Sequence, residues 1–170
     1  MDLSKVVRDV PDFPHKGIMF RDITPVIKTP EYFRAAVDQI IESVTDIEYD
    51  VIAGPESRGF IFGTPVAVSV GKGFVPIRKA GKLPYKTIRR EYDLEYGSSV
   101  IEMHIDAIDK GQKVLIVDDL LATGGTSKAM CELIESAGGI ITGLVFLIEL
   151  SDLDGRKVLS GYDVRSILKY

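Results

Sequence analysis

The sequence predicts an α/β fold, a mostly parallel central sheet flanked by helices, built as a single domain over residues 1–170. Two observations predict this class. Short apolar segments alternate along the chain with segments of helical periodicity, which is typical of strand–helix–strand units. The apolar segments are nearly continuous, as in parallel strands that are buried on both faces. The length suits one domain with one hydrophobic core.

Two helices are predicted by apolar residues at helical spacing. Thr29 and Pro30 form a start signal, a side-chain cap followed by proline in the first turn, and apolar residues then recur over 33–44. The same spacing recurs over 129–137, until a glycine pair stops the helix.

A third helix is expected over 58–71 and a short one within 152–159. Pro65 is expected in the first turn of the third helix and no nearer its middle, because proline removes a helical hydrogen bond. Strands are expected over 50–54, 74–78, 100–108, 113–117 and 140–150. The strand over 100–108 alternates apolar and polar residues, which predicts Glu102 and His104 on its other, solvent-facing side.

Composition excludes several classes of function. The net charge of −4 gives no global positive field for nucleic acid. The lone cysteine, Cys131, excludes an intramolecular disulfide framework, suits a reducing compartment and is expected as a packing residue on a helix. The N-terminal residues do not form a secretory signal, and no apolar run approaches the roughly 18 residues of a membrane span. We therefore expect a cytoplasmic protein without nucleic-acid or membrane partners.

The segment "VLIVDDLLATGGTSKAM", 114–130, carries the strongest chemical signal. Asp118 and Asp119 follow an apolar strand, and ligands of open α/β sheets bind beyond the carboxyl ends of the strands. Two adjacent carboxylates repel each other, so we expect them to meet a metal ion or hydroxyl donors such as a ribose diol. The small residues "ATGGTS" then stand where a helix begins, and backbone amides at a helix N-terminus bind phosphate.

These observations favour a sugar-phosphate site, with a diol and a phosphate held about one sugar apart. The segment matches neither the GxxxxGK[ST] loop nor GxGxxG after a strand. On spacing alone, a polar strand–helix turn capped by threonine and serine remains the alternative.

The segment resembles the phosphoribosyl-diphosphate (PRPP) signature of the type I phosphoribosyltransferases. The resemblance extends over roughly residues 13–160 and includes the motifs "FRDITP" (20–25), "ESRGF" (56–60), "IRKAGKLP" (77–84), "LEYG" (94–97) and "ELSDLDGRKVL" (149–159). Together these motifs are most similar to the family members that act on adenine. The resemblance implies a transferase that joins adenine to PRPP and releases AMP and diphosphate. It also implies the fold of that family, with a small hood and a flexible lid loop.

The resemblance implies roles for residues of three segments. Asp118 and Asp119 would hold the ribose 2′- and 3′-hydroxyls and stabilise the cationic ribose as it forms. The 5′-phosphate would lie against six consecutive residues: Ala122, Thr123, Gly124, Gly125, Thr126 and Ser127. Glu56 and Ser57 would be joined by a non-proline cis peptide bond, next to Arg58 as a cation near the departing diphosphate.

Residues 78–90 hold six of the chain's 21 lysines and arginines. A solvated face, a nucleic-acid patch and a lid over a polyanion are the alternatives, and the flanking glycine and proline together with the resemblance favour the lid. The expected diphosphate ligands are Arg78, Lys79 and Lys82, whereas Lys86, Arg89 and Arg90 are expected to be solvated or steering charges.

The resemblance places Glu95 and Tyr96 over the site, with Glu95 assisting loss of the adenine N9 proton. Phe20 would stack on the base, Arg21 would read its edge through the backbone, and Leu153 would bracket the ring from the other side. Mg²⁺ is expected mainly on the diphosphate of PRPP rather than in a protein cage. A homodimer is expected from the resemblance alone.

Ala122 decides the expected base. Relatives that act on hypoxanthine and guanine carry an acidic residue at this position, so its absence disfavours 6-oxopurines. Orotate enzymes usually lack the "FRDITP" and "KLP" motifs, and the bacterial xanthine enzymes have asparagine at the position of Thr123. A PRPP-sensing transcriptional regulator would need a DNA-binding module and about a hundred more residues.

Overall fold

The computed structural model describes residues 1–94 and 97–170 and has the expected α/β architecture. A seven-stranded sheet has the order β5-β6-β4-β3-β7-β8-β9, and a separate two-stranded sheet pairs β1 with β2. The strands of the large sheet are β3 (Val51–Pro55), β4 (Gly73–Lys79), β5 (Thr87–Leu94), β6 (Gly97–His104), β7 (Lys113–Leu121), β8 (Ile140–Glu149) and β9 (Val164–Lys169).

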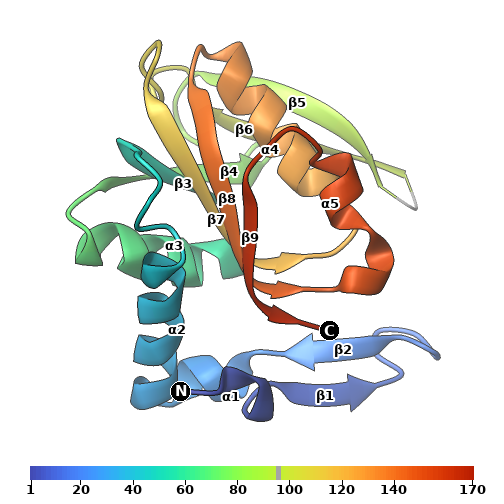
Figure 1. Ribbon diagram of the computed structural model, residues 1–170. Coiled ribbons are helices and arrows are strands. Elements are labelled where there is room, and N and C mark those ends of the chain that lie inside the picture. Colours follow the sequence, from blue (N-terminus) through green and yellow to red (C-terminus); the bar gives the residue numbers. More distant parts are fainter. Residues whose placement is uncertain (95–96) are drawn as a thin grey trace.

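Helices cover both faces of the large sheet (Figure 1). The helices are α1 (Thr24–Lys28), α2 (Pro30–Glu42), α3 (Arg58–Ser69), α4 (Gly125–Ser136) and α5 (Gly155–Val158), with short 3-10 turns η1 (Leu3–Lys5) and η2 (Ser151–Leu153). One core, which contains Ile52, Leu115 and Val145, packs against α2 and α3. The other, which contains Ile116 and Phe146, packs against α4 and the inner face of β5 and β6.

Parallel pairing at the middle of the sheet leaves two strand ends open. β3 pairs in parallel with β4 on one side and with β7 on the other. The pairing of β3 with β7 ends at Ala53 and Ile116, before the chain reaches Asp118. β7 thus separates from β3 toward the carboxyl ends of the strands, whereas β4 stays paired with β3 as far as Pro55. The carboxyl ends of the strands are where α/β sheets bind ligands.

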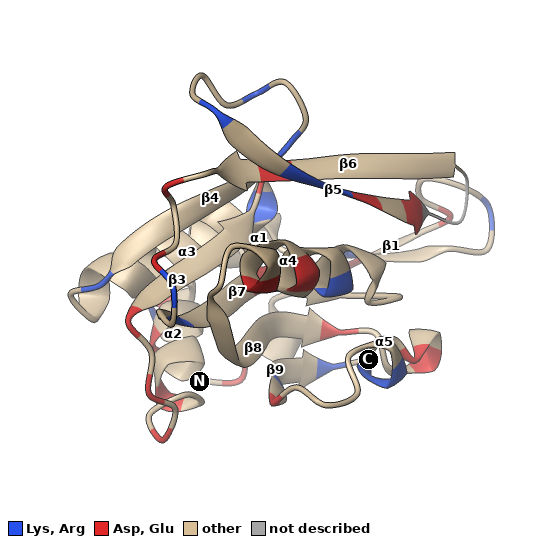
Figure 2. Cartoon of the chain, turned by 90° about the horizontal axis from the view of Figure 1, so that it is seen from above, with Lys and Arg blue, Asp and Glu red and all other residues tan. Residues whose placement is uncertain are grey.

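Residues 78–90, expected as a lid, include the end of β4 and the start of β5. β5 and β6 form an antiparallel hairpin whose register runs from Thr87–His104 to Leu94–Gly97. Among the described residues of this segment, the irregular ones are 80–86, in the turn before β5. Ile88 and Tyr92 pack against the core, which gives this otherwise charged segment one apolar face. Figure 2 shows lysines and arginines along that turn and on β5.

Pro65 lies inside α3, so its expected place in the first turn was wrong. The Thr64 hydroxyl donates to the Phe60 carbonyl within the same turn, and buried Phe62 and Val66 fix the helix against the sheet. Tertiary packing therefore outweighs the local cost of the proline. Thr29 is the N-terminal cap residue of α2 as predicted, but its side chain makes no capping hydrogen bond.

The N-terminal segment folds as η1 followed by a hairpin of β1 (Arg8–Pro11) and β2 (Met19–Asp22). This hairpin lies apart from the large sheet, beside the end of β9 (Figure 1). Within residues 1–94 and 97–170, no helix is long and apolar enough to cross a membrane.

Candidate active site

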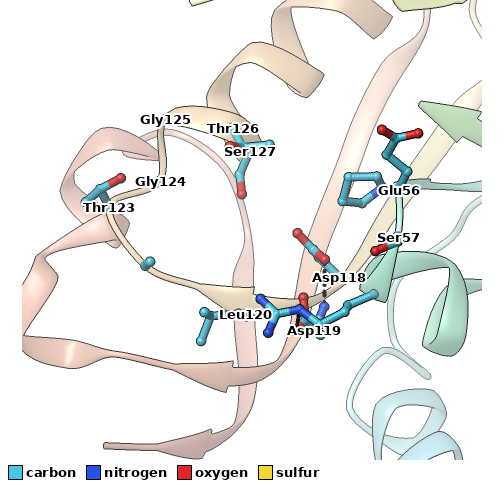
Figure 3. A pocket seen from close by; sticks show the side chains of 13 residues that line it. Glu56, Ser57, Asp118, Asp119, Leu120, Thr123, Gly124, Gly125, Thr126 and Ser127 are labelled. Carbon is cyan, nitrogen blue, oxygen red and sulfur yellow. Dashed lines mark hydrogen bonds and ion pairs between the residues drawn. The ribbon is translucent and has the colours of Figure 1, made fainter. Parts of the chain in front are cut away.

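One pocket of about 350 Å³ opens where β3 and β7 end. Figure 3 shows the side chains that line it, which come from two stretches of the chain, 55–58 and 118–127. Its lining residues are Pro55, Glu56, Ser57, Arg58, Asp118, Asp119, Leu120, Ala122, Thr123, Gly124, Gly125, Thr126 and Ser127. The residues predicted for the ribose and its 5′-phosphate therefore lie around one cavity.

Asp118 and Asp119 lie within β7 rather than beyond it, because β7 continues to pair with β8 as far as Leu121. Both residues are buried: Asp118 is 8% exposed and Asp119 is 6% exposed. The Asp119 amide donates to Asp118 Oδ1 at 2.7 Å. Burial, and then the neighbouring charge of Asp119, raise the pKa of Asp118 well above its usual range. A site built this way favours ligands that donate hydrogen bonds to the carboxylates.

Arg58 lies on the same side of the pocket as Asp119. Its Nε is 2.9 Å from Asp119 Oδ2, and its guanidinium carbon is 5.7 Å from the centre of the Phe20 ring. Burial raises the pKa of Asp119, and the charge of Arg58 opposes that shift. Arg58 thus stands between the carboxylate pair and the expected base-stacking face, and its contacts in this structure are not with the other predicted diphosphate ligands.

The start of α4 forms the part of the pocket that is predicted to bind phosphate. Gly124 caps the helix with a φ of 85°, a left-handed conformation that glycine adopts without strain. A Cβ on Gly124 would lie 2.7 Å from the Gly155 carbonyl oxygen. Glycine therefore allows the loop to lie against α5 at the start of α4, where the positive end of the helix dipole favours an anion.

The predicted diphosphate ligands gather around Glu56. Arg78 Nε donates to Glu56 Oε2 at 2.7 Å, and Lys82 Nζ donates to Glu56 Oε1 at 2.9 Å. Burial raises the pKa of Glu56, but the hydrogen bonds from Lys82 and Arg78 lower it by more than burial raises it. The pKa of Glu56 therefore lies below its ordinary value. Lys79 lines an adjoining cavity of about 270 Å³, which Glu56, Arg78 and Thr126 also line. The peptide bond between Glu56 and Ser57 is cis, as predicted.

Two of the cations expected as solvated charges are ion-paired. Arg89 Nε lies 3.0 Å from Glu102 Oε2, and Arg90 Nη2 lies 2.5 Å from Glu132 Oε2 on α4. Lys86 is exposed, as expected. These pairs attach β5 to its neighbours, so Arg89 and Arg90 contribute to the position of the hairpin.

The predicted adenine residues lie on two separate units. Phe20 and Arg21 are on β2 of the small sheet, and the Phe13 ring meets the Phe20 ring edge-on with centroids 5.1 Å apart. Leu153 lies in η2, with 45% of the residue exposed. The predictions for Glu95 and Tyr96 lie outside the described residues.

Sequence reasoning missed two polar residues near the site. Glu102, expected on a solvent face, is 1% exposed. Tyr92 was not considered, although its hydroxyl accepts a hydrogen bond from Thr126 Oγ1 at 3.2 Å. Ile88 and Tyr92 have the even spacing of one strand face, and that spacing is the signal from which β5 could have been predicted.

The site's donor set contains carboxylates from two segments: Glu56 directly follows β3, and Asp118 and Asp119 are on β7. In the part of the chain that the structure describes, no group of three or more His, Cys, Asp or Glu side chains could hold a metal ion. Oxygen ligands such as these suit Mg²⁺, which commonly keeps its waters and binds through one or two carboxylates and substrate phosphates. The residues present therefore fit a magnesium ion that arrives with a phosphorylated substrate.

Comparisons with known proteins agree with this geometry. The family model described as "Phosphoribosyl transferase domain" matches residues 31–168. The adenine phosphoribosyltransferase of Thermotoga sp. (strain RQ2) is 56% identical over 170 residues, and the match covers all of both chains. That of Acetivibrio thermocellus is 58% identical over 171 residues, again over all of both chains.

Solved structures match equally well. The crystal structure of adenine phosphoribosyltransferase from Thermoanaerobacter pseudethanolicus superposes with a TM-score of 0.97 at 51% identity, covering 99% of this chain and 98% of that one. The Saccharomyces cerevisiae enzyme, complexed with an imino-altritol bisphosphate and adenine, gives 0.91 at 39% identity, covering 97% and 96%. The chain therefore belongs to the phosphoribosyltransferase family and, within it, to the adenine phosphoribosyltransferases.

Proposed function

We propose that the protein transfers the 5-phosphoribosyl group of PRPP to adenine and forms AMP and diphosphate. One observation carries the proposal: a carboxylate pair and a helix-start phosphate cradle line the same pocket, in a chain of this family. The bond from ribose C1 to the diphosphate oxygen breaks, and the bond from C1 to adenine N9 forms. Adenine loses its N9 proton in the process.

Asp118 and Asp119 act on the ribose. The 2′- and 3′-hydroxyls of PRPP donate to these carboxylates, which need donors because both are buried beside each other. Positive charge develops on the ribose ring as the diphosphate departs, and fixed negative charge below the ring stabilises it. Arg58, paired with Asp119, favours the ionised form of that carboxylate.

The 5′-phosphate binds the amides and hydroxyls of the loop before α4: Ala122, Thr123, Gly124, Gly125, Thr126 and Ser127. The diphosphate binds Arg78, Lys79 and Lys82. In the structure Glu56 holds two of these cations, Arg78 and Lys82, so the incoming diphosphate exchanges one anionic partner for another. Mg²⁺, when bound to the diphosphate, neutralises charge on the leaving group.

Adenine stacks on Phe20, is read along its edge by the Arg21 backbone and is bracketed by Leu153. Ala122 offers no carboxylate to a purine N7, which favours adenine over 6-oxopurines. On the resemblance alone, Glu95 accepts the N9 proton and Tyr96 helps to close the site, which protects the cationic ribose from water.

We also propose a homodimer that acts in purine salvage in the cytoplasm. The family resemblance supports the dimer and the pathway. A single free cysteine, buried at Cys131, supports a reducing compartment.

The test supplies purified protein, PRPP and Mg²⁺ with adenine, hypoxanthine, guanine, xanthine or orotate in turn. We expect AMP and diphosphate from adenine and little or no product from the other bases. Turnover of an oxopurine without turnover of adenine would contradict the proposal. The variant Asp119→Asn serves as the control for the site, because it keeps the shape of the side chain and removes the charge below the ribose.

A further inference from the structure

Tyr170 contacts both units that carry the adenine residues. Its backbone amide donates to the Glu149 carbonyl at 2.9 Å, and its carbonyl accepts from the Ser151 amide at 2.8 Å. Ser151 begins η2, the turn that ends at Leu153. The backbone of Tyr170 is therefore attached to the turn that bears one wall of the adenine site.

The side chain of Tyr170 reaches the other unit. The guanidinium carbon of Arg21 lies 4.1 Å from the centre of the Tyr170 ring, a cation–π contact at close range. Arg21 is also ion-paired with Asp9 on β1, so its cation is fixed within the small sheet. The Tyr170 hydroxyl makes a longer bond, 3.4 Å, to the Ser4 carbonyl.

The Tyr170 ring stabilises the buried guanidinium of Arg21. Among residues 1–94 and 97–170, the buried Arg21 Nε has no hydrogen-bond partner. The negative face of the ring compensates part of the cost of burying that cation. Burial raises the pKa of the Tyr170 phenol, which keeps the ring neutral.

Among the described residues, no strand of the small sheet pairs with one of the large sheet, and Figure 1 shows the small sheet beside the end of β9. The distance between the two adenine walls therefore depends on side-chain contacts. We propose that Tyr170 is a positioning residue for the adenine site: it fixes β2, with its Phe20 face, relative to the turn that carries Leu153. This inference rests on the proposed function, because it concerns the adenine half of that site.

Steady-state kinetics of Tyr170→Leu test the inference. Leucine keeps the backbone hydrogen bonds and much of the apolar volume and removes the π face. We expect the KM for adenine to rise about five- to tenfold, because a partly buried cation–π contact is lost. The KM for PRPP and kcat should stay within about twofold of the wild-type values. Tyr170→Phe, which keeps the ring, is expected to restore the KM for adenine.

Tyr162→Leu is the matched control. Tyr162 also stacks on a cation, with Lys128 Nζ 5.0 Å from its ring centre, and donates to Glu135 at 2.9 Å. Its loss is expected to lower Tm without changing the KM for adenine. Equal adenine KM values for Tyr170→Leu and wild type would overturn the inference, as would a rise shared equally by PRPP.

A double-mutant cycle keeps the test decisive if Tyr170→Leu folds poorly. Arg21→Met removes the cation and leaves the backbone of β2, so it should raise the KM for adenine by a similar factor. In the Arg21→Met background, Tyr170→Phe should change the KM for adenine no more than it does in the wild-type background. An adenine KM unchanged by Arg21→Met would overturn the inference. Absence of adenine turnover in the wild type would instead overturn the proposed function.

Discussion

Replacement of Glu102 by glutamine tests how a buried carboxylate holds the turn before β5, which we propose binds the diphosphate. Glu102 lies on β6 and is 1% exposed. Its Oε1 accepts from the amides of Gly81 at 2.9 Å and Leu83 at 3.4 Å, and its Oε2 accepts from Thr87 Oγ1 at 3.2 Å and Arg89 Nε at 3.0 Å. The turn that these bonds hold carries Lys82 toward the site.

Glutamine keeps one acceptor oxygen for the two amides and places an NH₂ group against two other donors. Loss of the bonds to Thr87 and Arg89 costs about 2–3 kcal/mol of unfolding free energy, with the ion pair discounted because Arg89 is 61% exposed. For a chain of this length that corresponds to a Tm lower by about 5–10 °C.

The pH dependence of this difference follows from the pKa of Glu102. Burial raises that pKa, but the interactions with Gly81, Leu83, Thr87 and Arg89 together lower it by more than burial raises it. The pKa of Glu102 in the folded protein therefore lies below the ordinary 4.5. A depressed folded pKa gives stability that is present above the unfolded value and lost as pH falls through the folded value. The Tm difference between wild type and Glu102→Gln should therefore shrink below about pH 4.5.

Thermal unfolding at pH 7 and pH 3.5, together with kinetics at pH 7, measures the effect. The KM for PRPP should rise more than the KM for adenine, because Lys82 lies in the turn that loses its anchor. Glu91→Gln is the control: Glu91 is exposed on β5 and accepts from Ser98 Oγ at 2.9 Å. Equal Tm values for the two variants, or a Tm difference independent of pH, would refute the reasoning.

Three further substitutions test other parts of the site. In Gly155→Ala the new Cβ would lie 2.3 Å from the Ala122 carbonyl oxygen, so the phosphate loop must shift and the KM for PRPP should rise about tenfold; an unchanged KM would contradict this contact. Burial and the charge of Asp119 raise the pKa of Asp118 in the folded protein. The contribution of protonated Asp118 to the free energy of unfolding is therefore fully present below the unfolded pKa of 3.8 and is lost as pH rises through the folded pKa. Asp118→Asn should therefore melt above wild type at pH 8 but not at pH 3.5, with a lower kcat/KM. Arg58→Ala should lower kcat/KM about 100-fold, and wild-type kinetics would remove Arg58 from the site.

The sequence alone predicted which residues of 118–127 line the pocket, because the signals for them are local. An apolar run before Asp118 and Asp119 predicts a buried strand that ends at a ligand site, and Gly124 and Gly125 before a helical pattern predict a phosphate loop. Strand, loop and helix lie within one short segment, so their relation in space follows from their order. The cavity around these residues agrees with that prediction.

Tertiary structure decided the features whose partners are distant in sequence. Residues 87–94 look like a charged loop, yet they form a strand because Arg90 meets Glu132 and the inner face packs on the core. Glu102 looks like a solvent-facing residue, yet amides from the turn before β5 enclose it. Tyr170 carries no local signal, and its importance comes from contacts with Ser151 and with the small sheet. Periodicity tells which face of a strand is apolar, but whether a polar side chain is buried depends on the donors that other segments bring to it.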